Sequence, residues 1–234
     1  MLVTRALRVA AGAAADLLFP ARCVHCGEPG RLLCDRCIGI SVRLTGPACR
    51  SCAAPMPSGD RCWRCAERPP ATSRTVALFQ MDGPIRTAVH RLKYEDLRAV
   101  APVLGDLMAA HPALDRVHAD VVMPVPLHRR RLRSRGYNHA ELLARPVAVR
   151  LGVHVDTRTL RRVRASPPQV EAADEAERRL RVADAFEAGA AASGKRVLLV
   201  DDVCTTGATL DACARALKRA GAAWVGALVL AKEL

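Results

Sequence analysis

Residues 197–209 read VLLVDDVCTTGAT, and this stretch decides the fold. Its four leading apolar residues predict a buried strand over 196–200, with two adjacent acids at the carboxyl end of that strand. Small hydroxylated residues and a glycine come next and lead into a helix predicted over 209–220. A buried strand, a tight turn and a helix in this order indicate an α/β domain.

The chemistry of this stretch describes a sugar-phosphate site. Asp201 and Asp202 repel each other at the end of a buried strand unless a diol, a metal or a cation satisfies them. The turn over 205–209 directs backbone N–H groups and hydroxyls to one point at a helix N-terminus, which suits a monophosphate. A diol beside a phosphate is ribose 5-phosphate. The alternative, a helix cap by Thr205 or Thr206 with solvated acids, explains the threonines but not the acids.

The rest of the chain predicts a parallel sheet flanked by helices. From Thr75 onward, short apolar runs alternate with helical stretches. The expected strands are 76–80, 119–125, 153–155, 160–163, 196–200 and 224–231, and the expected helices are 84–94, 97–111, 137–151, 174–186 and 209–220. Pro146 should kink the helix over 137–151 or mark its first turn. Ligands of such sheets bind outside the carboxyl ends of the strands.

A cluster of arginines follows the strand expected over 119–125. Five arginines come directly after PVPLH at 124–128, and we expect them to lie in a loop: Arg129, Arg130, Arg131, Arg133 and Arg135. Pyrophosphate needs several cationic donors, and each guanidinium supplies two at once. Because five side chains cannot all reach one ligand, we expect one or two at the site and the others facing solvent or nucleic acid.

The composition favours anionic partners. The chain has 36 Lys+Arg against 23 Asp+Glu, a formal net charge of +13. Such a charge suits nucleic acid, pyrophosphate or an anionic membrane surface. A GC-biased genome that raises the arginine content explains the total equally well, so local clusters are more informative. Aromatic residues make up only 3% of the chain, which weakens any interpretation that needs many base-stacking platforms.

Eight of the ten cysteines form Cys-x-x-Cys pairs, all before residue 66: Cys23/Cys26, Cys34/Cys37, Cys49/Cys52 and Cys62/Cys65. Two pairs complete a tetrahedral four-sulfur site, so the spacing predicts two structural zinc ions with no open coordination position. Sequential pairing is favoured, although interleaved pairing is sterically allowed. His25 is expected to be a bystander. The module either binds nucleic acid or a partner, or only braces the N-terminus.

The N-terminus predicts a helix over 1–19, which we interpret as a docking helix. A basic start and small residues at 13–15 also allow a signal peptide, but Asp16 interrupts the short apolar run. No stretch reaches the length of a transmembrane helix. We therefore expect a cytoplasmic protein with three parts: the helix over 1–19, a double zinc ribbon over 20–68 and an α/β domain over 75–234.

The stretch at 197–209 resembles the fingerprint of type I phosphoribosyltransferases, and the chain from Leu17 onward resembles the ComF (competence protein F) family. Further matching motifs are LKY at 92–94, PVP at 124–126, RGYN at 135–138, Gln169, Glu177-Arg178 and Ala185-Phe186. The chain departs from the family at His139, where Gln is usual, at Arg181, where Asn is usual, and at Pro146. These departures concern contacts to the acceptor.

The resemblance implies a double zinc ribbon followed by a phosphoribosyltransferase-like domain that binds 5-phosphoribosyl-1-diphosphate (PRPP). It implies that Asp201 and Asp202 hold the ribose hydroxyls. It also implies a cradle for the 5-phosphate made of Thr205, Thr206, Gly207, Ala208 and Thr209. We further expect Arg129, Arg133 and Arg135 to face pyrophosphate and Lys93 and Tyr94 to contribute nearby.

The expected activity is Mg²⁺-dependent transfer of phosphoribose with release of pyrophosphate. The family resemblance also implies a link to DNA uptake in natural transformation, where single-stranded DNA is handled at the inner face of the membrane. Two alternatives stay open. The protein could sense PRPP and bind single-stranded DNA without turnover, or it could be a nucleobase salvage enzyme.

Overall fold

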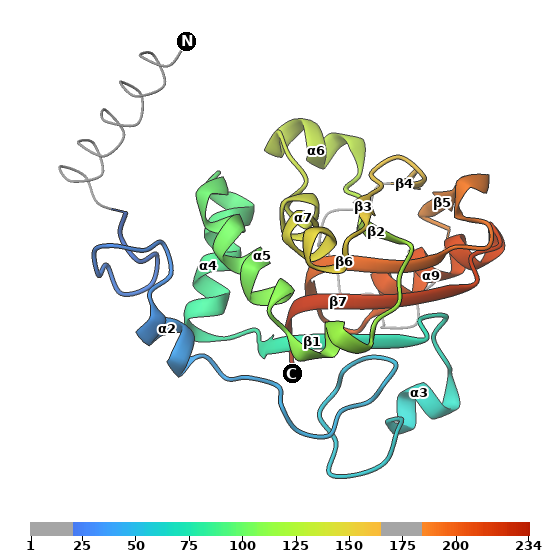
Figure 1. Ribbon diagram of the computed structural model, residues 1–234, viewed down its shortest axis with the longest axis horizontal. Coiled ribbons are helices and arrows are strands. Elements are labelled where there is room, and N and C mark those ends of the chain that lie inside the picture. Colours follow the sequence, from blue (N-terminus) through green and yellow to red (C-terminus); the bar gives the residue numbers. More distant parts are fainter. Residues whose placement is uncertain (1–20, 165–183) are drawn as a thin grey trace, which may run out of the picture.

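Five parallel strands form the central sheet of the computed structural model, which describes residues 21–164 and 184–234 (Figure 1). The strands are β1 (Arg74–Gln80), β2 (Val121–Pro124), β3 (His154–Val155), β6 (Arg196–Cys204) and β7 (Trp224–Lys232). Their order in the sheet is β1-β7-β6-β2-β3, and every neighbouring pair is parallel. The predicted parallel sheet is confirmed.

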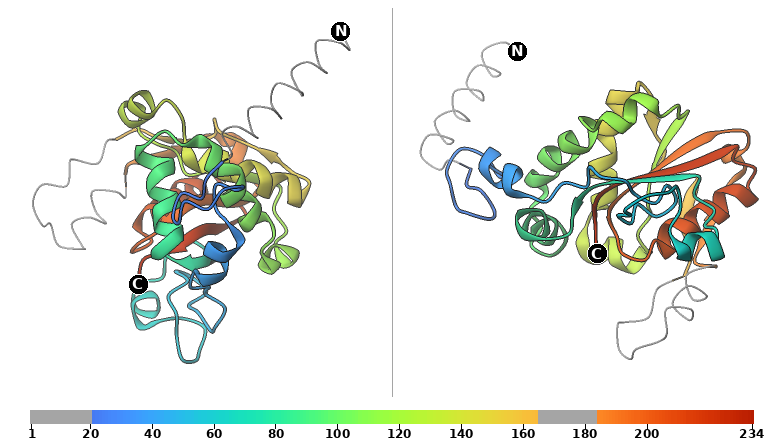
Figure 2. Two further views of the ribbon diagram at one scale, coloured as in Figure 1. Left: turned by 90° about the vertical axis from the view of Figure 1, so that its left-hand side faces the viewer. Right: turned by 90° about the horizontal axis from the view of Figure 1, so that it is seen from below.

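Helices cover both faces of this sheet (Figure 2). The main ones are α4 (Gly83–Tyr94), α5 (Ala101–Ala109), α7 (His139–Leu151) and α9 (Ala208–Arg219), whereas the short helix α6 (Arg129–Arg135) has no buried residue. Buried residues of α4, α5 and α7 share one apolar cluster with Leu198 and Val200 of β6. Those of α9 share a second cluster with Val197 and Leu199. Because β6 is buried on both faces, its sequence over 197–200 is a continuous apolar run.

Several boundaries differ from the sequence expectation. Strand β6 continues through the two acids to Cys204, so Asp201 and Asp202 lie within the strand and not after it. The helix expected over 97–111 divides into the short 3₁₀ turn η1 (Arg98–Val100) and α5, followed by a second turn, η2 (Pro112–Arg116). Pro102 explains the start of α5, because proline is well accommodated in a first helical turn.

Pro146 lies in the middle of α7, which runs on through it. A side chain at Gly105 of α5 would come within 2.8 Å of the Pro146 ring, so this glycine permits close packing of α5 against α7.

A small antiparallel pair flanks the sheet. It consists of β4 (Leu160–Arg162) and β5 (Phe186–Ala188), and the 3₁₀ turn η3 (Ala190–Ala192) follows. The strand expected over 160–163 is therefore confirmed. The helix expected over 174–186 is wrong at its end, because Phe186 opens a strand. The rest of that helix lies outside the described residues, as do the expected helix 1–19, Gln169, Glu177, Arg178 and Arg181.

The N-terminal segment packs along the edge of the sheet and contains two short helices, α2 (Asp35–Ile40) and α3 (Trp63–Glu67). The chain between them lies beside β1 (Figure 1), where Arg43 pairs with Phe79 in an antiparallel bridge. Cys23 and Cys37 contribute to the same apolar cluster as α4. Within the part of the chain that the structure describes, no helix has both the length and the apolar character that crossing a membrane requires.

Candidate functional site

The acid pair is buried at the carboxyl edge of the sheet. Asp201 and Asp202 are 9% and 2% exposed. Strand β2 ends where Pro124 pairs with Val200, so β6 carries the two acids beyond the end of its neighbour. Such an edge is where parallel sheets bind ligands. Two buried carboxylates need compensating charge or hydrogen bonds, and their surroundings show where this compensation comes from.

Lys93 and His139 provide the compensation. Lys93, near the end of α4, places Nζ 2.5 Å from Oδ2 of Asp202. The Nε2 atom of His139 lies 3.4 Å from Oδ1 of Asp202 and 3.9 Å from Oδ1 of Asp201. Apart from its ion pair with Lys93, Oδ2 of Asp202 has no hydrogen-bond partner of suitable geometry among the described residues. It therefore keeps capacity to accept a hydrogen bond.

The tautomer of His139 follows from its second partner. Nη1 of Arg135 lies 2.7 Å from Nδ1 of His139. A guanidinium can only donate, so Nδ1 accepts and the ring proton resides on Nε2, directed toward Asp202. The guanidinium of Arg135 also lies 5.5 Å from the ring centre of Tyr94. Arg135 thus connects the end of α6 with the end of α4 and with the acid pair.

The segment between α6 and α7 is fastened to the core. The Tyr137 hydroxyl donates to the carbonyl of Leu92, and the Asn138 amide donates to the carbonyl of Val125 at 3.0 Å. The Asn138 side chain also accepts from Ala140 N at 3.1 Å and so caps α7. These contacts hold His139 in the first turn of α7, facing the acids. The sequence marked position 139 as a departure from the family but did not indicate this contact.

The two acids have opposite pKa shifts. Burial, followed by the charge of Asp202, raises the pKa of Asp201 well above its ordinary value. Burial would also raise the pKa of Asp202, but the hydrogen bond from His139 and the charge of Lys93 outweigh it and lower this pKa. At neutral pH the pair therefore holds one firmly ionised carboxylate beside one that ionises reluctantly.

The loop after β6 opens a helix and leaves its N-terminus accessible. Gly207 caps α9 at φ 83°, a left-handed conformation that favours glycine. The Thr206 hydroxyl accepts from Ala208 N at 3.3 Å, and both Thr205 and Thr206 are exposed. Lys232, at the end of β7, donates from Nζ to the Thr205 carbonyl at 2.8 Å. The sequence predicted the loop at 205–209 but gave no sign of Lys232, which lies far from it along the chain.

The arginine cluster forms a helix, α6, and not the expected loop. The His128 ring accepts from Arg130 N at 3.3 Å and caps this helix, and Gly136 ends it at φ 78°. Arg129, Arg130, Arg131 and Arg133 are exposed, whereas Arg135 is half-buried. Arg129 lines a separate cavity of about 730 Å³ with Pro126 and Glu187. Of the five arginines, only Arg135 contacts the residues around the acid pair.

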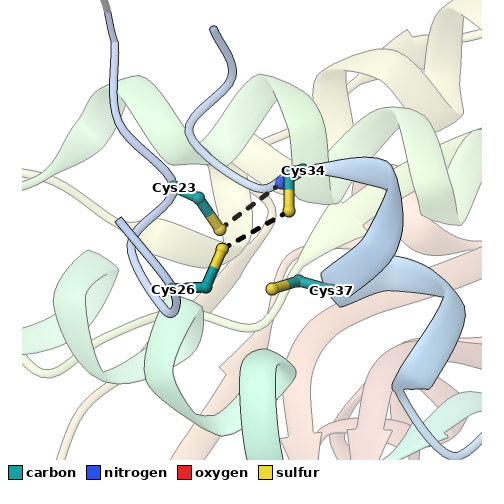
Figure 3. Close-up of side chains that lie close together, drawn as sticks. All are labelled: Cys23, Cys26, Cys34 and Cys37. Atoms are coloured by element: carbon teal, nitrogen blue, oxygen red, sulfur yellow. Dashed lines mark hydrogen bonds between the residues drawn. The ribbon is translucent and has the colours of Figure 1, made fainter. Parts of the chain in front are cut away.

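The eight paired cysteines form two clusters of four. The clusters are Cys23, Cys26, Cys34 and Cys37, and Cys49, Cys52, Cys62 and Cys65. Within each cluster all ligand atoms lie within 4.8 Å of one another. The four side chains of the first cluster converge on one point (Figure 3). The favoured sequential pairing is confirmed. His25 contacts Thr87 instead, as expected of a bystander.

The geometry of both clusters fits zinc. The sulfurs of Cys26 and Cys34 lie 3.6 Å apart, and those of Cys52 and Cys62 lie 3.7 Å apart. A tetrahedral site with Zn–S bonds of about 2.3 Å needs sulfurs about 3.8 Å apart. The other two cysteines, Cys204 and Cys213, are buried in the α/β domain.

Comparisons with known proteins agree with this arrangement. Residues 134–234 match the phosphoribosyl transferase domain family, and residues 14–66 match the double zinc ribbon domain family. The DNA utilization protein YhgH of Salmonella typhi is 32% identical over 230 residues, which cover 93% of this chain and 100% of that protein. The chain belongs to the ComF/YhgH family.

Other members of the ComF/YhgH family are more distant. Competence protein F of Haemophilus influenzae is 27% identical over 214 residues, which cover 87% of this chain and 93% of that protein. Among solved structures, the glutamine PRPP amidotransferase from B. subtilis is 22% identical, with a TM-score of 0.39, over 56% of this chain and 26% of that chain. The expected ComF membership, with a double zinc ribbon before a phosphoribosyltransferase domain, is confirmed.

Proposed function

We propose that this ComF/YhgH protein binds PRPP and Mg²⁺ and transfers the phosphoribosyl group to an acceptor with release of pyrophosphate. One observation carries the proposal: two adjacent carboxylates, one of them paired with Lys93, are buried at the carboxyl edge of the sheet, next to an accessible helix N-terminus. A ribose has two vicinal hydroxyls and a 5-phosphate, which need these two kinds of partner.

Different residues of the site bind different parts of PRPP. Asp201 and Asp202 accept hydrogen bonds from the ribose hydroxyls, and Oδ2 of Asp202 has the free acceptor capacity for one of them. The turn over 205–209 holds the 5-phosphate through backbone N–H groups and the exposed Thr205 and Thr206 hydroxyls. Gly207 suits this role because its left-handed conformation turns the backbone into α9.

The pyrophosphate belongs on the side of the acids that carries Lys93 and Arg135. Both cations contact the acid pair or its His139 neighbour, so they stand within reach of a group attached to the ribose. Tyr94 supports Arg135 from α4. When bound, Mg²⁺ would neutralise the charge that develops on the departing pyrophosphate. Arg129 and Arg133 are exposed and have no hydrogen bond or ion pair with the acids, and they fit a role in attracting anions.

The reaction breaks the bond between the anomeric carbon and pyrophosphate and forms a bond from that carbon to the acceptor nucleophile. Positive charge develops on the ribose ring as pyrophosphate leaves, as in glycoside hydrolysis. The ionised carboxylate of Asp202 lies where it stabilises this charge, and His139 holds that carboxylate in place through its Nε2–H. The acceptor's proton leaves with the product or passes to solvent.

A second function, binding of single-stranded DNA, draws on the exposed arginines of α6. Arg129, Arg130, Arg131 and Arg133 make a positive surface of a kind that attracts phosphates. Relatives carry the names DNA utilization protein and competence protein. In this form of the proposal PRPP is sensed and not turned over. A role in DNA uptake would place the protein in the cytoplasm, at the inner face of the membrane.

The test is pyrophosphate release from PRPP with Mg²⁺, measured with free bases, amines and single-stranded DNA offered as acceptors. We expect release that depends on one acceptor class and is lost in Asp202→Asn. PRPP binding without turnover on any acceptor would support the sensing function instead. Turnover with one purine or pyrimidine alone would identify a salvage enzyme, and the zinc ribbon would then be incidental to catalysis.

A further inference from the structure

A second cavity lies between the zinc ribbon and the loop over 205–209, which we call the phosphate loop. It has a volume of about 740 Å³ and lies between the second cysteine cluster and the start of α9. One wall comes from the ribbon, including Met56, Arg61 and Trp63, and the other from residues 204–208 together with Lys232. Neither Asp201 nor Asp202 lines it. The cavity therefore reaches the phosphate loop without including the proposed ribose site.

Lys232 gives this cavity a buried positive charge that has no counter-ion among the residues that the structure describes. The residue is 5% exposed, and its ammonium donates to the Thr205 carbonyl. Among the described residues no carboxylate forms an ion pair with it, although Lys93 and several arginines of the same part of the chain have such partners. A buried ammonium is costly without an anion, and this one faces a helix N-terminus that also favours anions. A phosphate group would bind the ammonium of Lys232 and the N-terminus of α9 at the same time.

The ribbon wall offers a partner for a planar group. Trp63 is 72% exposed and is one of the residues that line the cavity. Exposed indole rings bind planar bases well because stacking covers the whole ring face. Arg61 is exposed on the same wall and adds a cation.

Charge in this cavity is predominantly positive. The cationic residues lining it are Arg61, Arg64, Arg68, Arg215 and Lys232. Among the described residues of this lining the only carboxylate is Asp211, which pairs with Arg215 at 3.0 Å and accepts from Ala71 N. A zinc–tetrathiolate site nearby would add a charge of about −2, and cations would still be in excess.

We propose that this cavity binds a 5′-mononucleotide, with its phosphate between Lys232 and the N-terminus of α9 and its base against Trp63. The volume suits a ligand of this size, since small-molecule sites measure about 300–1,000 Å³. The nucleotide uses the phosphate loop from the ribbon side, and its ribose does not reach the acid pair.

The nucleotide and PRPP then compete for one phosphate subsite. This competition rests on the proposed PRPP function, whereas the nucleotide site itself does not. The zinc ribbon thereby becomes part of a regulatory ligand site, and a nucleotide bound there lowers the apparent affinity for PRPP.

Calorimetric titration of the full chain tests the proposal, with AMP, GMP, CMP, UMP and, as a probe without a base, ribose 5-phosphate. We expect at least one mononucleotide to bind about tenfold more tightly than ribose 5-phosphate. Trp63→Ala should remove that preference without unfolding the protein, because the side chain is exposed. Lys232→Met should weaken the binding of mononucleotides about tenfold. Lys218→Met is the matched control, because it removes an exposed lysine that also donates to a carbonyl. It should leave the affinity for mononucleotides unchanged.

Two results with the wild type and Trp63→Ala would overturn the proposal. One is equal affinity for ribose 5-phosphate and every mononucleotide, and the other is a preference that persists in Trp63→Ala. Asp202→Asn separates this proposal from the PRPP function. This variant should weaken the binding of PRPP and leave the binding of mononucleotides unchanged. If it weakens the binding of both ligands, the mononucleotide binds at the acid pair and not in this cavity. A protein that binds mononucleotides but not PRPP would contradict only the PRPP function.

Discussion

The ammonium of Lys93 lies 2.5 Å from the carboxylate of Asp202, across the gap between the end of α4 and strand β6. The two side chains are 20% and 3% exposed, so the charge of Lys93 acts on Asp202 with little screening by water. Lys93 is thus the internal counter-ion of the ionised acid. Among the described residues, no lysine or arginine pairs with Asp201 in this way, and the asymmetry leads to the first prediction.

Asp201→Asn should stabilise the protein at neutral pH. The pKa of Asp201 in the folded state lies above its ordinary value of 3.8, so from about pH 4 upward the unfolded chain ionises more readily than the folded one. The wild type loses stability over that range, and the variant does not. We expect a gain on the order of 1 kcal/mol or more at pH 7 that fades below about pH 4. Urea denaturation of both proteins at the two pH values measures it.

The control for this prediction is Asp202→Asn, which should have the opposite sign. The pKa of Asp202 is lowered in the folded state, so its charge stabilises the fold above pH 3.8 and this contribution is lost on acidification. The variant also leaves Lys93 without its partner. We expect a loss on the order of 2 kcal/mol at pH 7. Equal effects of the two substitutions would contradict the assignment of charges.

His139→Gln should preserve the site, whereas His139→Leu should not. A glutamine amide can donate to Asp202 and accept from Arg135, as the neutral imidazole does. Leucine leaves a buried carboxylate without its donor, which costs about 1–3 kcal/mol. We expect the unfolding free energy to fall by that amount in the leucine variant and by less than half of it in the glutamine variant. If both variants lose the same stability, the hydrogen bond through Nε2 is not the reason.

Each chain should contain two zinc ions, bound independently. Cys37→Ser and Cys65→Ser should each reduce the zinc content by one, because each removes one of four ligands from a separate cluster. Cys213→Ser removes a buried cysteine outside the clusters and should leave both ions in place. Elemental analysis of the purified proteins measures the content. One zinc in the wild type, or loss of both ions in either cluster variant, would rule out two independent sites.

Neutralising α6 should weaken single-stranded DNA binding mainly at low salt. Replacement of Arg129, Arg130, Arg131 and Arg133 by Gln should reduce the slope of log affinity against log salt by about 0.7 for each phosphate that the helix no longer neutralises. The matched control is Arg145→Gln with Arg150→Gln on α7, since both of these arginines are paired with acids. A slope that is the same in all three proteins would exclude α6 from DNA binding.

The sequence predicted the parts of the site that depend on local pattern. The apolar run, acids and threonine loop of 197–209 lie close together along the chain, and so do the members of each Cys-x-x-Cys pair. Side-chain periodicity and ligand spacing therefore sufficed for the sheet, the turn between β6 and α9 and the cysteine clusters.

The rest depends on contacts between distant segments. Lys232 reaches Thr205 only because β7 pairs with β6, and no local motif records that pairing. His139 faces Asp202 only because Tyr137 and Asn138 fix the start of α7 on the core. The arginines at 129–135 were expected in a loop because they follow the carboxyl end of a buried strand. Arginine is nevertheless a good helix former, and the caps at His128 and Gly136 complete α6.

Calorimetric titration with PRPP in the presence of Mg²⁺ tests the central claim most directly, with wild type and Asp202→Asn compared at pH 7. The account predicts that the wild type binds PRPP and that Asp202→Asn binds it at least about tenfold more weakly, because a charged hydrogen bond to the ribose is lost. Absence of binding to the wild type, or unchanged affinity in the variant, would contradict it.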